Sequence, residues 1–261
     1  MKTNKKTLIM LCGFIFYSIQ IFAQNNPSGM GGGYLPNLAG AKYTLAVHEV
    51  NFEGVADGGQ KLNYGQIKGS PFWKEEYSIA SLYTYDNLML GKARVKMNFL
   101  TNEIYYLDKQ EIELVIPIDL VSKLIIHPQG DTSKRLTLFR RSPSEFFVND
   151  KPVEDFVQEL NDGNLKLLKL TRRKVASADS LFGTKKRYFF TTDEYYFVGY
   201  NKSIHQVKKL SRESVLNFVP SATSYDKWIT ENKINFKKEE DIIRFFNHYN
   251  QQQQVSKQSA Q

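Results

Sequence analysis

The chain has 261 residues, of which 41% are hydrophobic and 13% aromatic, and its formal net charge is +8 at pH 7. Its single cysteine is Cys12. If Cys12 is removed with a leader, the mature chain has no disulfide, no thiolate zinc site and no cysteine nucleophile. The length suits one large domain or two small ones, and it is enough to bury a hydrophobic core. Without disulfides this core depends on side-chain packing, to which 18 Phe and 15 Tyr can contribute.

The first 23 residues predict a secretory signal peptide. Three lysines precede an apolar run over residues 8–17, and Ala23 offers a cleavage site before Gln24. This run is about half the length that a membrane-spanning helix needs. We therefore expect an exported protein, periplasmic or at the cell surface. A lipid anchor at Cys12 is the less favoured alternative, because no small residue stands just before it.

Charge limits the classes of partner. Removing the three leader lysines lowers the formal charge from +8 to +5. This charge is either solvated or attracts an anionic surface such as lipopolysaccharide, phospholipid or an acidic glycan. Another envelope protein is a further possible partner. Nucleic acid is not expected for an exported chain, and without a second long apolar segment the protein is not expected to be integral to the inner membrane.

Composition divides the remaining chain into three parts. Residues 24–40 are rich in Gly, Asn and Pro and predict a flexible linker, without the spacing of a phosphate-binding loop. Residues 41–250 are expected to form a single domain. Residues 251–261, which are rich in glutamine and poor in apolar side chains, predict a disordered tail.

The predicted fold class is α+β, a mainly antiparallel β-sheet followed by three short C-terminal helices. Residues 94–99 alternate between apolar and polar, which predicts a strand with one buried face. Short turns lead to strands at 103–107 and 111–116, and strands so close in sequence favour an antiparallel meander. Further strands are predicted at 120–127, 136–140, 145–148, 164–170, 186–191 and 195–200, with Thr192-Asp193 as a hairpin turn between the last two.

Four segments carry helical patterns. Pro152 followed by apolar residues at 153, 156, 157 and 160 predicts a helix that ends at Asp162-Gly163. Ser211 is expected to cap a short helix that Pro220 ends, and Thr223 or Ser224 a second one. The third C-terminal helix begins near Lys238, and its apolar stripe consists of Ile242, Ile243, Phe245, Phe246 and Tyr249.

No catalytic, cofactor-binding or metal-binding residue is predicted. The four histidines are too far apart in sequence for metal-pair spacing, and the G-x-S-x-G motif of many serine hydrolases is missing from the sequence. Adjacent carboxylates are candidates for glycoside hydrolysis at Glu75-Glu76, Asp193-Glu194 and Glu239-Glu240-Asp241. The first pair lies between Trp73 and Tyr77, whose rings could stack on a sugar. The other two are better explained as a turn and as acids at a helix N-terminus.

The densest basic stretch is a candidate ligand site. It predicts an anionic-ligand patch made of Lys169, Arg172, Arg173, Lys174, Lys185, Lys186 and Arg187. Leucines alternate with its first lysines, so the other interpretation is a strand edge whose lysines prevent sheet-to-sheet association.

Three blocks of the sequence resemble a family of exported Bacteroidetes proteins. The blocks are Ile67-Lys68-Gly69-Ser70-Pro71-Phe72, residues 91–106, and the closing segment from Trp228-Ile229 to Tyr249-Asn250. The resemblance covers about three-quarters of the mature chain through hydrophobic patterns. It agrees with export but implies no activity, because that family has none assigned.

These features lead to two hypotheses of different class. The first is an envelope-associated binding or structural component without catalytic activity. The second is a secreted or periplasmic hydrolase of glycans or peptides, with a site assembled from residues distant in sequence. A purely structural or chaperone-like role is not separable from the first by sequence.

Overall fold

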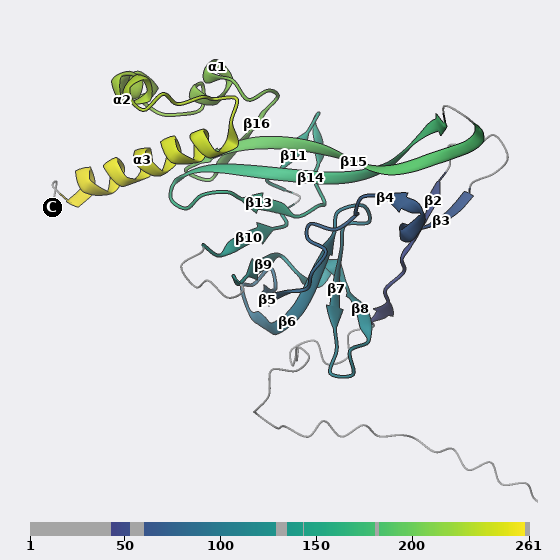
Figure 1. Ribbon diagram of the computed structural model, residues 1–261. Helices are drawn as coiled ribbons and strands as arrows, with labels where there is room; N and C mark the ends of the chain where they lie inside the picture. The colour runs from purple at the N-terminus through teal and green to yellow at the C-terminus, as the bar shows by residue number, and fades with distance from the viewer. Residues whose placement is uncertain (1–42, 53–59, 129–134, 143, 181–182, 259–261) are drawn as a thin grey trace, which may run out of the picture. The chain divides into compact units, whose positions relative to one another are not determined.

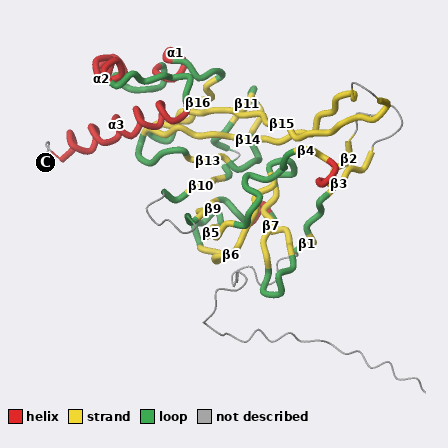
Figure 2. The backbone as a smooth tube through the Cα atoms, in the orientation of Figure 1, coloured by secondary structure: helices red, strands yellow, loops and turns green. Residues whose placement is uncertain are grey.

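The computed structural model describes residues 43–52, 60–128, 135–142, 144–180 and 183–258 (Figure 1). The predicted signal peptide over 1–23 and the predicted linker over 24–40 lie outside these residues. The fold is α+β, mostly antiparallel sheet with three C-terminal α-helices among the described residues, as the sequence predicts. Figure 2 shows the strands and helices along the backbone.

A twelve-stranded sheet forms the main element of the described chain, in the order β1-β8-β7-β6-β5-β9-β10-β13-β14-β15-β16, with β4 beside β15. Two two-stranded sheets, β2 with β3 and β11 with β12, complete the β-structure described. The strands of the first half are β1 (Thr44–Leu45), β2 (Glu49–Phe52), β3 (Gln60–Asn63), β4 (Ile67–Lys68), β5 (Ser78–Tyr83), β6 (Met89–Asn98), β7 (Glu103–Leu107) and β8 (Glu113–Ile116). The second half comprises β9 (Lys123–Ile126), β10 (Thr137–Arg140), β11 (Phe147–Val148), β12 (Lys151–Pro152), β13 (Val157–Glu159), β14 (Leu165–Ser180), β15 (Gly183–Tyr200) and β16 (Ser203–Val207).

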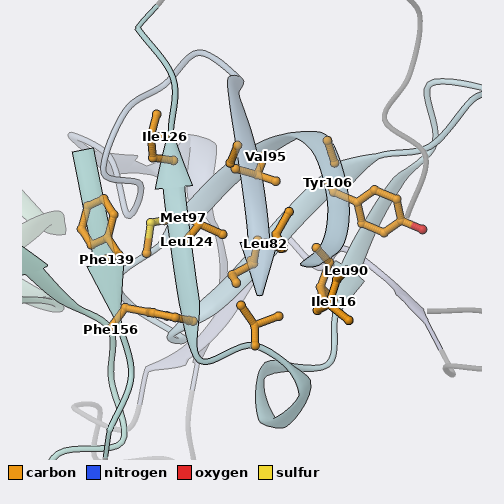
Figure 3. Packing of buried hydrophobic residues seen from close by; sticks show 14 of the residues in the cluster. Leu82, Leu90, Val95, Met97, Tyr106, Ile116, Leu124, Ile126, Phe139 and Phe156 are labelled. Atoms are coloured by element: carbon orange, nitrogen blue, oxygen red, sulfur yellow. The ribbon is translucent and has the colours of Figure 1, made fainter. Parts of the chain in front are cut away.

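The predicted meander is confirmed in β6, β7 and β8. Met97 pairs with Ile104, and Ile104 pairs with Ile116, all antiparallel. These three side chains are buried in one apolar cluster with Leu124 and Phe139 from the strands that follow (Figure 3). Alternation in β6 therefore places one face of the strand on a core, as the 94–99 pattern predicts.

The predicted helix over 152–160 is wrong. Pro152 ends the short strand β12, and Val157–Glu159 form β13, which pairs with both β10 and β14. A helix this short is marginal by itself. Two neighbouring strands offer the same backbone groups a full set of partners, while Phe156 and Val157 are buried in two different apolar clusters. Pairing of β13 with β10 and β14 therefore outweighs the helical spacing of the apolar residues.

The predicted hairpin turn at Thr192-Asp193 is also wrong. β14 and β15 form one long two-stranded ribbon, paired from Leu165↔Tyr200 to Ser180↔Gly183. Thr192 and Asp193 lie in mid-strand, opposite Arg173 and Arg172. A β-branched residue and a cross-strand pair of opposite charges both favour continued pairing at this point.

Three α-helices follow the ribbon in the described chain: α1 (Arg212–Leu216), α2 (Asp226–Glu231) and α3 (Glu239–Gln258). Ser211 caps α1 as predicted, its Oγ accepting from Ser214 N at 3.2 Å, whereas residues 222–225 form a 3₁₀ turn before α2. Further 3₁₀ turns are Tyr64–Gln66 and Ile118–Leu120. The stripe of α3 packs with Leu165, Leu167 and Val198 in a second core. No helix among the described residues has the length and apolar character needed to cross a membrane.

The predicted disordered tail is helical as far as Gln258, and only 259–261 lie outside the described residues. Glutamine is a good helix former, and adding residues to an existing helix is far easier than nucleating one. The docked stripe of α3 supplies that nucleus, and Gln253 approaches the Tyr225 hydroxyl at 3.5 Å.

Candidate functional site

The seven basic residues predicted as a patch do not share one surface. Side chains alternate along β14, so Lys169 and Arg173 project from one face and Arg172 and Lys174 from the other. Partners already engage all four: Glu194 and Glu239 hold Lys169, Asp155 holds Arg172, Asp193 holds Lys174, and Thr192 accepts from Arg173. These four positions therefore stabilise the ribbon.

Lys186 and Arg187 lie farther along β15 and line a different feature, which we call the hairpin pocket. Lys185 also lies in β15, but its side chain is outside the described part of the molecule. The hairpin pocket has a volume of about 860 Å³ and is lined by residues 65–69, Ala178 and residues 186–190. It forms where β4 pairs in parallel with β15, Ile67 opposite Tyr188 and Lys68 opposite Phe189.

The segment before β4 is held rigidly against the ribbon. Asn63 and Gln66 form a reciprocal capping box around the turn that precedes β4. The buried Tyr64 ring meets the Phe190 ring edge-on, with centroids 5.9 Å apart. Gly69 takes a φ of +96°, a conformation that side-chain-bearing residues rarely adopt. One wall of the pocket is therefore preformed.

The hairpin pocket combines cations with aromatic rings. Its cations are Lys68, Lys186 and Arg187, and none of them forms an ion pair within the described part of the chain. Alternation along β15 places Arg187 and Phe189 on one face, with Lys68 opposite Phe189, and Lys186 on the other face with Tyr188 and Phe190. No acidic residue is among its described lining residues, although Asp179 lies opposite Lys186 in the strand register. Ammonium and guanidinium groups bind phosphate and carboxylate through charge-assisted hydrogen bonds. The arrangement suits an anionic group attached to an apolar or ring-containing body.

Sequence reasoning missed Lys68 and the aromatic wall at 188–190. The basic run 185–187 was a candidate, but no local pattern shows that residues 67–68 pair with residues 188–189. The available signals were weak: Lys68 lies in a block that carries the family resemblance, and three aromatic residues follow Arg187 directly.

A Ser–His contact is the feature that bears on the hydrolase hypothesis. Ser81 Oγ lies 2.8 Å from His127 Nε2. Burial, with a smaller effect of Lys92, lowers the pKa of His127 and so favours the neutral imidazole. Ser81, however, is buried in the middle of β5, between β6 and β9, where neighbouring amides serve the sheet instead of an oxyanion hole.

The contact also lacks the other parts of a hydrolytic site. No carboxylate partner of His127 is found among the described residues, and neither Ser81 nor His127 lines any of the four pockets described. A triad needs an oriented base and a place for the acyl group. This pair provides neither, and it fits a buried structural hydrogen bond.

The adjacent carboxylates do not converge as glycosidase pairs. Glu75 and Glu76 are exposed and line none of the described pockets. Asp193 pairs with Lys174, while Glu194 lies on the opposite face of β15. The acids at 239–241 occupy the first turn of α3, where the helix dipole favours them.

Glu194 and Glu239 instead meet in a closed network at the start of α3. Lys169 Nζ lies 3.0 Å from Glu194 and 2.9 Å from Glu239. The Tyr196 hydroxyl is 3.0 Å from Glu194 and 2.9 Å from Glu239. Burial and the hydrogen bond to Glu239 raise the pKa of Tyr196. Burial alone would lower the pKa of Lys169, but its hydrogen bonds to both glutamates raise it.

We expect the free energy of unfolding to fall as the pH rises above about 10. Folding raises the pKa of both Tyr196 and Lys169. The protonated forms of these groups therefore stabilise the folded protein in full at pH values below their pKa in the unfolded chain. This stabilisation is lost as the pH rises through their pKa in the folded protein. Urea unfolding at pH 8 to 11 should show a shallower decline for Tyr196→Phe, by up to about 1.4 kcal/mol per pH unit. Tyr195→Phe, on the opposite face, is the control, and equal slopes for both variants would refute the assignment.

Comparison of the chain with protein-family models, with curated proteins and with solved structures gave no match.

Proposed function

We propose that this protein is an exported, non-enzymatic component of the cell envelope that binds an anionic group in the hairpin pocket. The observation that carries the proposal is the set of three cations, Lys68, Lys186 and Arg187, without ion-pair partners in the described chain, beside three aromatic residues. The predicted signal peptide supplies the compartment, and the resemblance to exported Bacteroidetes proteins agrees with it.

The chemistry favours a phosphate-bearing envelope lipid over a free acidic glycan. Each face of β15 at the pocket sets a cation beside an aromatic ring, Arg187 and Lys68 with Phe189 and Lys186 with Tyr188 and Phe190. A phosphate group gains from the cation, and the ring offers apolar surface to the rest of the ligand. A free polyanionic glycan would gain from the cations but less from the rings. A volume of about 860 Å³ lies in the usual range for small-molecule sites, ~300–1,000 Å³.

The test is sedimentation with vesicles of phosphatidylglycerol mixed into phosphatidylcholine. The triple variant Lys68→Gln, Lys186→Gln, Arg187→Gln should lose about 100-fold in affinity, since each cation near an anionic surface contributes about 1 kcal/mol. The matched control replaces Lys151, Lys209 and Lys237, all exposed, with glutamine. It removes the same charge elsewhere and should retain nearly all binding.

Three outcomes would contradict the proposal. Equal losses in the two triple variants would mean that net charge, and not the pocket, causes the attraction. Undiminished binding by the pocket variant would remove the site from the interaction. Binding to a soluble acidic glycan but not to vesicles would replace the lipid with a glycan as ligand.

The hydrolase remains the second hypothesis, and the Ser81–His127 contact is the observation in its favour. It ranks below binding because Ser81 is buried within a strand and no described pocket reaches it.

A further inference from the structure

A second pocket, here called the junction pocket, lies on the face of the ribbon that carries Lys169. Its volume is about 430 Å³, and its lining comes from segments far apart in sequence. Trp73 follows β4, Phe99 follows β6, and Gln158 lies in β13, while the remaining lining residues belong to β14 and β15. None of these residues belongs to the hairpin pocket, so the two sites are independent.

The indole of Trp73 is fixed in place. The backbone N–H of Trp73 donates to Met97 O at 2.9 Å, next to an antiparallel β-bridge between Phe72 and Asn98. The indole meets the Phe139 ring edge-on with centroids 5.2 Å apart, and Lys74 Nζ lies 4.4 Å from the indole centroid. A held aromatic side chain binds a ligand with little loss of its own conformational entropy.

The rest of the lining offers both donors and acceptors. Thr171 pairs with Glu194 across the ribbon and Arg173 with Thr192, so strand alternation directs these four side chains to the same face. Gln158, opposite Lys169 in the register, adds an amide that can donate and accept. Hydroxyl, amide, carboxylate and guanidinium groups beside one indole match a ring that carries many hydroxyl groups.

Charge separates this site from the hairpin pocket. Lys169 is neutralised by Glu194 and by Glu239 behind it, and Arg173 is the one further charged residue among the described lining residues. With Lys74 over the indole, these five charged groups sum to +1. Lys169 is already held by two glutamates and Arg173 already donates to Thr192, so an anionic ligand would have to compete with existing contacts. A volume of about 430 Å³ is at the small end of small-molecule sites, ~300–1,000 Å³.

From these observations we infer that the junction pocket binds an uncharged sugar, with its ring beside Trp73 and its hydroxyl groups on Gln158, Thr171, Thr192 and Glu194. The apolar C–H groups of the sugar ring contact the indole, and its hydroxyl groups exchange hydrogen bonds with side chains that both donate and accept. This inference does not depend on the anionic ligand proposed above.

The two tryptophans of the chain make a direct test possible. Trp228 stacks on His248 with centroids 4.0 Å apart, and Trp228→Phe leaves Trp73 as the single reporter of tryptophan emission. Titration of this variant with maltose and with the N-acetylglucosamine disaccharide should give a saturable change in emission for at least one of them. Calorimetry on the protein with both tryptophans checks the affinity should Trp228→Phe disturb the fold.

Two variants and one matched control locate the binding. Gln158→Leu and Thr192→Val keep approximate shape, remove hydrogen-bonding groups from the pocket, and should each weaken binding at least about tenfold. Thr191→Val makes the same change one residue away, on the opposite face of β15, and should leave affinity unchanged.

The inference is overturned if neither neutral disaccharide changes Trp73 emission, or if Thr191→Val and Thr192→Val lose affinity equally. Tighter binding of glucuronate than of either neutral sugar would overturn the charge assignment. Vesicle binding through the hairpin pocket can succeed or fail separately from each of these results.

Discussion

Phe246→Ala is expected to destabilise the protein by about 3–5 kcal/mol, the range found when a buried phenylalanine is truncated. Phe246 is completely buried on α3, in the core that joins this helix to Leu165, Leu167 and Val198 of the ribbon. Its ring centroid lies 5.8 Å from that of Phe245, which is also fully buried. The variant loses the transfer free energy of the ring and leaves a cavity that rigid strands cannot close.

Urea unfolding at neutral pH measures this effect as a lower midpoint. Val255→Ala on the same helix is the control, since Val255 is 58% exposed and should change stability by about 0.5 kcal/mol or less. If Phe246→Ala unfolded at the wild-type midpoint, the stripe of α3 would have to contact a partner molecule instead of the sheet.

Asn250→Ala is expected to cost about 2–4 kcal/mol through hydrogen bonds alone. Asn250 Oδ1 accepts from Leu165 N at 2.9 Å, and its Nδ2 donates to Asp162 O and Leu165 O, each at 2.8 Å. The bond with the Leu165 N–H is buried, so truncation leaves a backbone donor away from water without an acceptor. Gly163 makes room for this amide, because a Cβ there would lie 2.5 Å from Asn250 Nδ2.

Hydrogen exchange distinguishes this mechanism from general loosening of α3. The Leu165 amide should lose protection in Asn250→Ala more than amides in the centre of α3 do. Gln251→Ala, one residue further along and exposed, should have wild-type stability and exchange. Unchanged protection at Leu165 would show that Asn250 does not hold the start of β14.

Where a segment's pattern and its tertiary surroundings agree, the sequence predicts the structure. The alternation over 94–99 has period two and its neighbouring strands are close in sequence, so β6, β7 and β8 form the predicted meander. The apolar stripe of α3 likewise has a single solution, since its buried residues must face a core. The α+β fold class follows from these segments.

Where a local residue pattern is compatible with two secondary structures, residues distant in sequence determine which of the two forms. Residues 152–160 carry helical spacing, but β10 and β14 lie on either side and draw Val157–Glu159 into the sheet. Thr192-Asp193 has the composition of a turn, yet Arg173 and Lys174 across the ribbon, which contact Thr192 and Asp193, keep it extended. Residues 251–258 lack apolar content, and the helix that precedes them carries them into α3.

The candidate site was partly visible in the sequence. Its basic residues stand out as a run, but alternation and ion pairing remove Lys169, Arg172, Arg173 and Lys174 from any common patch. Lys186 and Arg187 gain Lys68 only because β4 pairs in parallel with β15. Periodicity and composition are local properties and determine which residues are buried or charged. They do not determine which segments more than a hundred residues apart pair with each other. That choice depends on strand pairing and side-chain packing across the whole sheet.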